Sequence, residues 1–503
     1  MFSSTIQVSV FVFVTALIGF LTYLSCRGQN RNAQNQNREF FLAGGGLAWY
    51  FIAGSITLTN LSTDQLVGMN GNQMALLSLW EFSAVVGLFV LAKVFLPVYY
   101  KFKCTTTTEL LERRYNDKHI RAVISVLFFA GSALIFCPAV IYSGSLFMQS
   151  MFNVELPLMY IAVIFVVVGA LYAIFGGLRA VAVSDTYSGV LLLTMAVIVL
   201  ILALQAIDYN FDGIPQERLT LIGDNDSPIP WHTLLTGMIF IQMFYWGTNQ
   251  VITQRAMAAP SLKEAQKGVF AAAGIRLLIV PAIIVIPGIV SYKLFGDIGD
   301  SAYGKIVATV LPDWLSGVFA AAMAAAVLTT FNSNLNSATA LYVCDIHESY
   351  VNKTPNVPKL SGYVTVLLCL ISLALIPVYQ QADSIINLVQ KLYGLLSMPI
   401  LSVFIVGLLF RNVHAFAAIG AVTFGVSFYA FVSFEASPFY APFGLHYIHL
   451  MFATLIGCVS FALIVNRVIF RQKAEFSMAL NSDSPFEEEG SVENQSTLKN
   501  KNA

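Results

Sequence analysis

Charged residues are scarce in this sequence, at 11% of its 503 residues, whereas soluble proteins carry about 25%. Apolar residues make up 57% of the chain, and the mean hydropathy is +0.73. This composition excludes an ordinary soluble protein and predicts an all-α polytopic membrane protein.

The sequence also has little of what enzymes and metal sites need. None of its six cysteines is spaced for a metal site, and we expect them to act as small buried hydrophobic residues. The apolar segments hold no nucleophile and base pair, phosphate-binding loop or metal cluster, so an enzyme is the least favoured class. Residues 5–25 follow no basic region and precede no cleavage site, which predicts a retained helix rather than a signal peptide.

Long apolar segments, by contrast, recur along the whole chain. A membrane helix needs about 20 predominantly apolar residues. Thirteen windows meet this requirement: 5–25, 47–72, 75–100, 119–150, 156–176, 181–206, 231–258, 264–295, 303–345, 359–379, 382–410, 414–434 and 442–469. Several exceed the minimum length, so we expect tilted or kinked helices.

Basic residues are distributed unevenly over the loops between these windows. When alternate loops are assigned to one side, the opposite side holds only Arg218, Lys293 and Lys305. The first side collects Arg27, Arg31, Arg38, Lys101, Lys103, Arg113, Arg114, Lys118, Arg121, Arg179, Arg255, Lys263, Lys267, Lys353, Lys359, Arg411, Arg467, Arg471 and Lys473. By the positive-inside rule this side is cytoplasmic, which predicts an external N-terminus, a cytoplasmic C-terminus and residence in the plasma membrane, or in the inner membrane of a Gram-negative bacterium.

The second window, 47–72, changes from apolar to polar in its middle. Polar groups at bilayer depth are tolerated where they face protein or a watery cavity, so this window predicts a discontinuous helix whose unwound middle lines a binding site. The alternative is an ordinary helix whose hydroxyls bond back to their own backbone; the density of polar groups favours the first interpretation. These groups are Thr57, Thr59, Asn60, Ser62, Thr63, Asp64 and Gln65.

The window 231–258 repeats this pattern, because Gln242, Tyr245, Trp246, Asn249 and Gln250 interrupt an apolar run around Gly247. Each interrupted window opens a set of five. Since five is odd, the second set must cross the membrane in the opposite direction, as in an inverted-topology repeat. The predicted units are an N-terminal helix and cytoplasmic link (1–46), the first repeat (47–206), an external loop (207–230), the second repeat (231–411), two peripheral helices (412–473) and a disordered cytoplasmic tail (474–503).

Isolated polar residues stand in other windows. Glu81 is interpreted as a ligand contact, with a protonated or paired packing role as the alternative. Arg276 needs a partner or water, and Pro281 and Pro287 should kink its helix. Asp185 stands where an ion might leave, or is a favourable partner of a helix dipole.

A pair of threonines, Thr329 and Thr330, stands in an alanine-rich window. Their hydroxyls, together with carbonyls freed where 47–72 unwinds, would suit a hard cation. Such a pair, taken alone, more often holds neighbouring helices together by hydrogen bonds. Gln390, in the window 382–410, is placed to point into the centre of the bundle.

Several motifs in order resemble the sodium/solute symporter family, within it the sodium/glucose branch that includes the bacterial sodium/galactose symporter. They span residues 38–470 and are REFFLAGGG, TNLSTDQLVGMNG, WEFSA, YAIFGGLRAVAVSD, FYWGTNQVITQR, EAQKG and FNSNLNSATALYVCDI. The resemblance implies a LeuT-type core of two inverted five-helix repeats. It also implies alternating access and solute uptake driven by the sodium gradient.

The resemblance also implies site residues. The coupling ion Na⁺ would be held by carbonyls of Leu58, Leu61 and Ala326 and by the hydroxyls of Thr329 and Thr330, with Asp185 associated with sodium release and Asn332 near a second ion position of some relatives. The substrate contacts would be Asn60, Gln65, Glu81, Gln242, Tyr245, Trp246, Arg276 and Gln390, with Tyr245 as the inner gate. Gln242 and Arg276 replace an Asn and a Lys of the galactose transporter, which puts the particular sugar in doubt, because arginine and lysine are not equivalent.

Three functions remain open, with a monosaccharide as the favoured cargo of sodium-coupled symport. If Glu81 and Arg276 share one cavity, their charges cancel, which suits a neutral polyol better than a carboxylate. The alternative is a small organic anion, such as a carboxylate or sialic acid, held by an unpaired Arg276. The third is a channel or sensor that keeps the fold without coupling.

Overall fold

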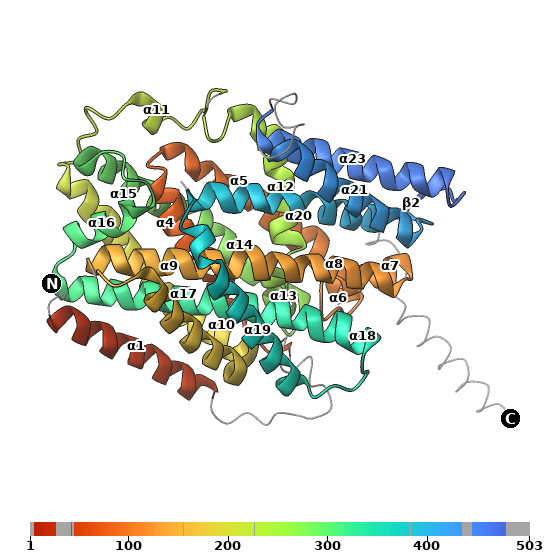
Figure 1. The fold of residues 1–503 in the computed structure, drawn as a ribbon, viewed down its shortest axis with the longest axis horizontal. Coiled ribbons are helices and arrows are strands. Elements are labelled where there is room, and N and C mark those ends of the chain that lie inside the picture. Colours follow the sequence, from red (N-terminus) through yellow and green to blue (C-terminus); the bar gives the residue numbers. More distant parts are fainter. Residues whose placement is uncertain are drawn as a thin grey trace.

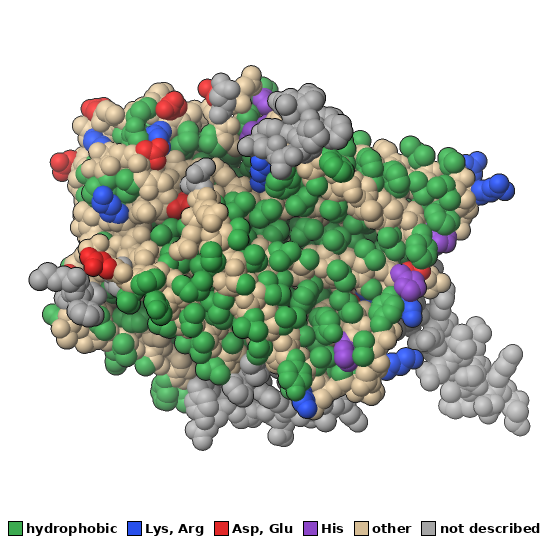
Figure 2. Space-filling model, viewed as in Figure 1, with side chains coloured by type: hydrophobic (Ala, Val, Ile, Leu, Met, Phe, Trp, Pro, Cys, Tyr) green, Lys and Arg blue, Asp and Glu red, His purple; other side chains and the backbone are tan. Residues whose placement is uncertain are grey.

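The computed structural model describes residues 5–26, 42, 45–153, 155–225, 227–382, 384–434 and 445–478. Within these ranges the chain is a bundle of helices (Figure 1). Nine described helices are long and apolar enough to cross a membrane, and two shorter apolar segments, Thr5–Leu21 and Leu158–Ala173, accompany them. A band of hydrophobic side chains crosses the visible face, with most charged side chains toward its ends (Figure 2). The all-α membrane architecture is therefore confirmed, whereas the count of thirteen spans stays a prediction.

The predicted discontinuous helix is present in the first repeat. It consists of α3 (Trp49–Asn60) and α4 (Thr63–Gly71). Between them Leu61 adopts φ −75° and ψ 60°, and Ser62 is extended at φ −87° and ψ 172°. Two non-helical residues therefore separate the halves, and the alternative of one continuous helix is wrong.

The second interrupted helix is also present. A 3₁₀ turn, η6 (Trp231–Leu235), leads into α12 (Gly237–Gly247), and α13 (Gln250–Met257) follows after Thr248 and Asn249. Asn249 caps α13, because its side chain accepts a hydrogen bond from the Val251 N–H at 3.0 Å.

The remaining helices of the first half surround α3 and α4. The helix α1 (Thr5–Cys26) packs against α17 and α10. The others are η3 (Ala75–Ser78), α5 (Leu79–Val90), the π-turn η4 (Leu91–Phe95), α6 (Leu96–Lys101), α7 (Glu109–Tyr115), α8 (Lys118–Gly131), the π-turn η5 (Ser132–Phe136), α9 (Cys137–Phe152), α10 (Leu158–Ala206) and α11 (Gln216–Leu219).

The second half follows the same plan around α12 and α13. It contains α14 (Leu262–Leu278), α15 (Val280–Phe295), η7 (Gly299–Ser301), α16 (Ala302–Val310), α17 (Asp313–Ala340), the π-turn η8 (Leu341–His347), α18 (Glu348–Tyr350), α19 (Val357–Tyr379) and α20 (Ile385–Leu409). The strand β1 (Phe410–Arg411), α21 (Ala415–Ser433), α23 (Tyr447–Val468) and β2 (Glu475–Phe476) complete the described chain.

The long element α10 takes in both of the windows 156–176 and 181–206, with 49 residues assigned as helical. A straight helix of this length would extend about 74 Å. Both of its ends nevertheless lie on one side of the bundle. The segment before it packs near α16, where a Cβ on Gly304 would lie 2.8 Å from Ser150, and the Asn210 carbonyl after it accepts a 2.5 Å bond from Lys293 at the end of the neighbouring α15. The chain therefore reverses direction within residues 158–206, so α10 is not one straight rod.

Proline sets two further boundaries. The window 303–345 is wrong as one span, because it divides into α16 and α17 at Pro312, which precedes the first residue of α17. Leu311 before this proline is extended, with φ −91° and ψ 136°, as steric contact with the proline ring requires. The window 264–295 is divided into α14 and α15 at Ile279, two residues before Pro281, as its prolines predicted.

The start of the predicted disordered tail is ordered. Strand β2 pairs antiparallel with β1, with Phe410 opposite Phe476. Ser477 donates its N–H to the Leu409 carbonyl at 2.8 Å, and its own carbonyl accepts from Arg114 at 3.1 Å. The prediction of disorder from residue 474 is therefore wrong for residues 475–477, and the rest of the tail from residue 479 lies outside the described residues.

Candidate functional site

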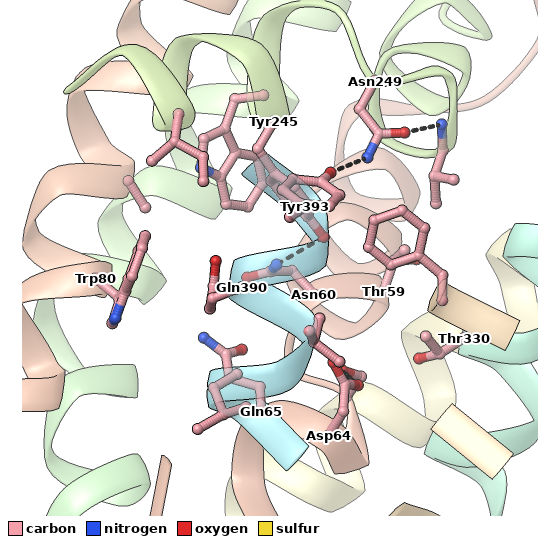
Figure 3. A pocket seen from close by; sticks show the side chains of 18 of the residues that line it. Thr59, Asn60, Asp64, Gln65, Trp80, Tyr245, Asn249, Thr330, Gln390 and Tyr393 are labelled. Carbon is pink, nitrogen blue, oxygen red and sulfur yellow. Dashed lines mark hydrogen bonds between the residues drawn. The ribbon is translucent and has the colours of Figure 1, made fainter. Parts of the chain in front are cut away.

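One cavity of about 100 Å³ lies where the two interrupted helices meet α5, α14, α17 and α20 (Figure 3). The structure brings to its wall every residue that the sequence proposed as a substrate contact. They are Asn60, Gln65, Glu81, Gln242, Tyr245, Trp246, Arg276 and Gln390. These residues come from six helices and span 331 positions of sequence, from 60 to 390, so only the fold places them together.

A buried ion pair, Arg276 with Glu81, forms one wall of this cavity. Both side chains are almost fully buried, at 0% and 2% exposure. The Gln65 amide also donates to Glu81, and the Arg276 guanidinium lies 4.9 Å from the centroid of the Trp246 ring. A buried charge without a partner is strongly destabilising. The expectation that Arg276 needs a partner is therefore confirmed, and Glu81 is that partner.

The amide of Gln242 is occupied by protein groups. Its Nε2 donates to the Trp80 carbonyl at 2.9 Å and to the Ser83 hydroxyl at 3.0 Å, while its Oε1 accepts from the Trp246 indole at 3.0 Å. Both amide hydrogens are used in these contacts. Gln242 thus orients Trp246 and retains one acceptor position for a ligand. Gln65 differs, because its buried Oε1 has no hydrogen-bond partner among the described residues.

Tyrosines from α12 and α20 form the aromatic side of the cavity. The Asn60 amide donates to the Tyr245 hydroxyl at 2.8 Å, and the Asn249 amide donates to the Tyr393 hydroxyl at 3.0 Å. The two tyrosine rings lie 6.0 Å apart (Figure 3). Each interrupted helix therefore holds one ring of this aromatic side through an asparagine.

The sequence did not propose several of the residues that line the cavity. Asn249 and Asp64 had a signal, because both stand in polar interruptions of apolar windows. Others gave no signal beyond an ordinary apolar or polar helix residue. These are Phe136, Val140, Ile386, Val389 and Asn334.

The residues proposed for sodium lie at the first helix break and on α17. The helical hydrogen-bond ladder pauses between the bond from Leu61 N–H to Thr57 and the bond from Leu66 N–H to Ser62, both 2.9 Å. The Leu61 carbonyl falls within this interruption, and Leu58 lies in the last turn of α3.

The other oxygen atoms proposed for sodium belong to α17. Thr329 donates to the Ala326 carbonyl at 3.3 Å. Thr330 lines the cavity, and its buried hydroxyl has no hydrogen-bond partner within the described chain. An unpartnered hydroxyl near an interrupted helical ladder fits a hard cation that takes oxygen ligands.

Asp185 lies in a buried polar cluster next to this region. Its Oδ2 accepts from the Ser55 hydroxyl at 2.6 Å and from the Thr59 hydroxyl at 3.4 Å, and lies 3.8 Å from the Arg255 guanidinium. Arg255 also donates to Ser55 at 2.8 Å and to the Ser333 hydroxyl. The helices α3, α10, α13 and α17 are therefore joined around one carboxylate.

This cluster corrects two sequence interpretations. Asp185 lies in the interior of α10, so its role as a partner of a helix dipole is wrong. Arg255 was assigned to a cytoplasmic loop, but its side chain is fully buried. The sequence missed it because a basic residue near the end of an apolar window looks the same whether it faces water or protein.

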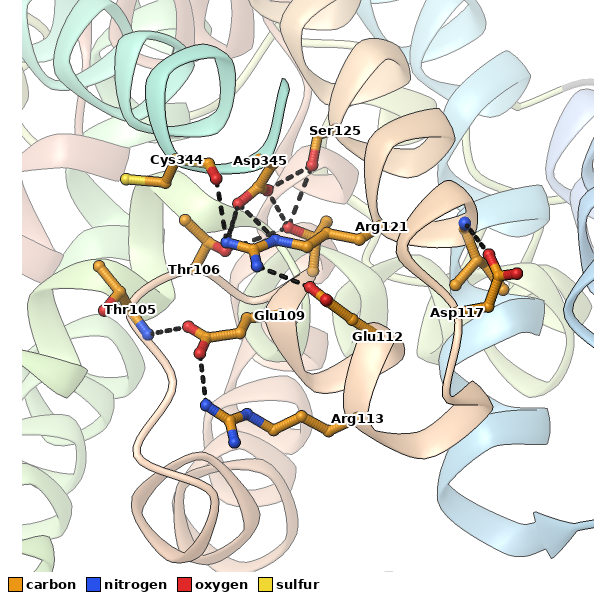
Figure 4. Close-up of polar contacts among 12 residues, drawn as sticks. Thr105, Thr106, Glu109, Glu112, Arg113, Asp117, Arg121, Ser125, Cys344 and Asp345 are labelled. Atoms are coloured by element: carbon orange, nitrogen blue, oxygen red, sulfur yellow. Dashed lines mark hydrogen bonds and ion pairs between the residues drawn. The ribbon is translucent and has the colours of Figure 1, made fainter. Parts of the chain in front are cut away.

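A third buried acid, Asp345, organises one end of the bundle (Figure 4). It forms an ion pair with Arg121 at 2.6 Å and accepts from the Thr106 hydroxyl at 2.8 Å. Thr108 and Ser125 donate to its other oxygen. Arg121, assigned to a loop by the sequence, is in fact mostly buried, with a 13% exposed side chain. This network ties the segment before α7 to α8 and η8.

Metal chemistry has no further support in the described part of the chain. Groups of three or more His, Cys, Asp or Glu side chains placed to hold a metal ion are absent from it. Its five described cysteines are free and buried, as the sequence predicted.

Comparison with known sequences gives consistent matches. A model of the Sodium:solute symporter family matches residues 40–425. The uncharacterized symporter YidK of Escherichia coli (strain K12) is 33% identical over 90% of this chain and 82% of its own length. The sodium/glucose cotransporter of Vibrio parahaemolyticus is 28% identical over 96% and 92%. The sodium/myo-inositol cotransporter 2 of Rattus norvegicus is 27% identical over 79% and 65%.

Comparison with solved structures shows the fold. A sodium-coupled sialic acid symporter, in a substrate-bound outward-open state, superimposes with a TM-score of 0.79 at 18% identity, covering 92% of this chain and 98% of the other. MhsT in complex with L-phenylalanine gives 0.51 at 14% identity, covering 86% and 99%. The architecture is the LeuT type, in agreement with the two interrupted helices.

Proposed function

Because the chain belongs to the sodium:solute symporter family, we propose that it imports a neutral, hydroxyl-rich solute, a monosaccharide or related polyol, together with sodium by alternating access. The observation that carries this proposal is the pairing of Glu81 with Arg276 on the wall of the cavity. The pair cancels its own charge and leaves donors and acceptors directed at a ligand. Two relatives, a sodium/glucose cotransporter and a sodium/myo-inositol cotransporter, support the same cargo class.

The proposed substrate contacts are the eight cavity residues predicted from the sequence. Asn60, Gln65 and Gln390 would exchange hydrogen bonds with hydroxyls, and the Glu81–Arg276 pair would bind them more strongly, because hydrogen bonds to charged groups are shorter and stronger. Tyr245 would cover the apolar face of a sugar ring as the inner gate. Trp246 and Gln242 would hold the wall behind it.

The competing cargo is a small organic anion bound by Arg276. In the structure the guanidinium is already paired with a carboxylate. An anion would have to displace Glu81 and leave that carboxylate buried without a partner, which is costly. The geometry therefore favours a neutral solute over an anion.

Sodium supplies the driving force in this proposal. It would bind the carbonyls of Leu58, Leu61 and Ala326 and the hydroxyls of Thr329 and Thr330, and leave past Asp185. Binding at this position would join the first interrupted helix to α17. Sodium would then favour the arrangement of these two elements to which it binds more tightly. With an inside-negative potential, each inward sodium supplies about 2.3 kcal/mol per 100 mV.

The proposed setting is the plasma membrane, or the inner membrane in a Gram-negative bacterium, with the N-terminus outside and the C-terminus in the cytoplasm. The unit boundaries predicted from the sequence are proposed with it, except that the tail begins after the β1–β2 pair. In this orientation the Asp345 network lies at the cytoplasmic end.

Uptake by purified protein in liposomes tests the proposal. An inward sodium gradient should drive accumulation of at least one labelled hexose or inositol above its external concentration, and replacing external sodium with potassium should abolish it. Accumulation of organic acids alone would overturn the neutral cargo. Equilibration without accumulation would show an uncoupled channel.

A further inference from the structure

The acids buried in this bundle differ in one respect. Glu81 is paired with Arg276, Asp185 with Arg255, and Asp345 with Arg121. Asp64 also lines the cavity, yet within the described part of the chain no arginine, lysine or histidine forms an ion pair with it. The side chain of Asp64 accepts a hydrogen bond from the Ser62 hydroxyl instead.

Two neighbouring groups stabilise the charged form of Asp64 against the cost of its burial. It stands in the first turn of α4, where the positive end of the helix dipole stabilises a carboxylate. The Ser62 hydroxyl donates to one of its oxygens. Figure 3 shows the side chain between Gln65 and Thr330 at the edge of the cavity.

The charges on the cavity wall then do not cancel. Asp64 and Glu81 are its carboxylates and Arg276 is its one cation, so the described lining carries one uncompensated negative charge. A carboxylate that stays charged away from bulk water needs a cation nearby. The oxygens proposed for sodium, by contrast, are all neutral carbonyls and hydroxyls. They bring no charge of their own to balance the ion.

We propose that Asp64 is the charge that balances the coupling sodium and, by the same means, excludes anionic solutes. This inference rests on the proposed function and deepens it. One sodium and one neutral solute make the loaded cavity electrically neutral. An anionic solute would leave it with a net negative charge, and a cationic solute with a net positive one. Asp64 therefore determines the charge of the accepted cargo without having to contact the ion.

Two substitutions separate charge from shape. Asp64→Asn removes the charge at nearly constant size, and Asp64→Glu keeps the charge. Asp313→Asn is the matched control, because Asp313 also stands in the first turn of a helix but is exposed and outside the cavity.

Sodium binding is measured first, without any solute, as sodium-dependent thermal stabilisation of the purified protein. Asp64→Asn should raise the half-saturating sodium concentration by about 10-fold, since a nearby opposite charge shifts such equilibria by one to three powers of ten. Asp64→Glu should stay within about threefold of the parent protein, and the control should not change. An unaltered sodium response in Asp64→Asn would overturn the proposal, as would equal weakening in Asp64→Glu.

Solute selection is measured second, by competition of hexoses, hexosamines and uronic acids for sodium-driven uptake. Asp64→Asn should improve the apparent affinity for a uronic acid, relative to that for its parent hexose, by about 10-fold. If this ratio is unchanged while the hexose is still transported, the charge-balancing role fails and the proposed function stands. If no hexose is transported by the parent protein but sodium binding still depends on Asp64, the cargo proposal fails and the ion-balancing role stands.

Discussion

The two interrupted helices differ in how their breaks are satisfied. At the second break the Asn249 side chain caps α13, the Thr248 hydroxyl donates to Phe244 at 2.8 Å, and the Tyr99 hydroxyl donates to the Gly247 carbonyl at 2.8 Å. At the first break Ser62 provides no side-chain cap, and its hydroxyl donates to Asp64 instead. The second break is thus closed by protein groups, whereas the first is open, and its carbonyls are among those proposed to bind sodium.

This difference explains why the two breaks contribute different parts of the site. A closed break holds its side chains in fixed positions, which suits the aromatic residues Tyr245 and Trp246 that form a wall. An open break exposes carbonyl dipoles in a region without bulk water, where they must be satisfied by an ion or another ligand. Inverted repeats therefore do not imply repeated chemistry.

The largest expected effect comes from the Glu81–Arg276 pair, which contacts both interrupted helices through Gln65 and Trp246. Glu81→Gln leaves Arg276 buried without its counter-charge, which costs about 3–5 kcal/mol. Sodium-driven hexose uptake should be lost, and thermal stability should fall. The exposed Glu217→Gln serves as control.

Adding Arg276→Gln to this variant should restore stability, because the uncompensated charge is then removed, but not uptake. Hexose uptake by Glu81→Gln at the parental rate would contradict the assignment of the pair to the substrate site. An uptake assay and a thermal denaturation of the same preparations decide the matter.

A substitution at the closed second break should lower the stability of the protein and leave sodium binding unchanged. Tyr99→Phe leaves the buried Gly247 carbonyl without its donor, at a cost of about 1–3 kcal/mol. Thermal unfolding should therefore occur at lower temperature while the half-saturating sodium concentration is unchanged. A weakened sodium response without a stability loss would reverse the distinction between the breaks.

The open break and α17 should behave in the opposite way. Thr330→Ala removes one hydroxyl that has no protein partner. Stability in the absence of sodium should change little, whereas sodium dependence should weaken by about 10-fold, equivalent to 1.4 kcal/mol. Solute affinity at saturating sodium should be retained, and Thr330→Ser should behave as the parent protein. Equal losses of sodium and solute affinity would count against Thr330 as an ion ligand.

The smallest effect concerns Asp300, beside the end of α4. Its Oδ2 accepts from the Ile385 N–H at 3.0 Å, and burial raises its pKa to about 6. A carboxyl whose pKa is higher in the folded state than in the unfolded state stabilises the fold most when protonated. This contribution is complete below about pH 4 and declines as pH rises to 6.

Asp300→Asn should remove that dependence. The difference in melting temperature between the variant and the parent protein should therefore change between pH 4 and pH 6 and stay constant above about pH 6.5. A difference in melting temperature that stays constant over the whole pH range would show that Asp300 has the same pKa in the folded and unfolded states. Asp297→Asn, which affects an exposed ion pair with Arg218, is the matched control.

Local composition was sufficient to predict the helix breaks. Polar residues in an apolar window of spanning length must face protein or a cavity, because lipid offers no hydrogen-bond partners. Both breaks occur where Ser62 and Gly247 indicated. The need of Arg276 for a partner followed from the same rule. That Glu81 is this partner depended on the placement of α5 beside α14, which pattern alone does not fix.

The failures have a common physical origin. Arg255 and Arg121 were counted as loop charges, yet α17 and η8 supply polar partners that allow them to be buried. The β1–β2 pair joins residues that are 66 positions apart.

The sequence by itself determined that this chain spans a bilayer, that two of its helices are interrupted, and which polar residues stand at the interruptions. It could do so because the cost of burying polar groups in lipid acts on each segment separately. Tertiary structure alone decided which acids meet an arginine and that Asp64 does not. Charge compensation acts between segments, over a few ångströms, and is therefore set only when the helices pack.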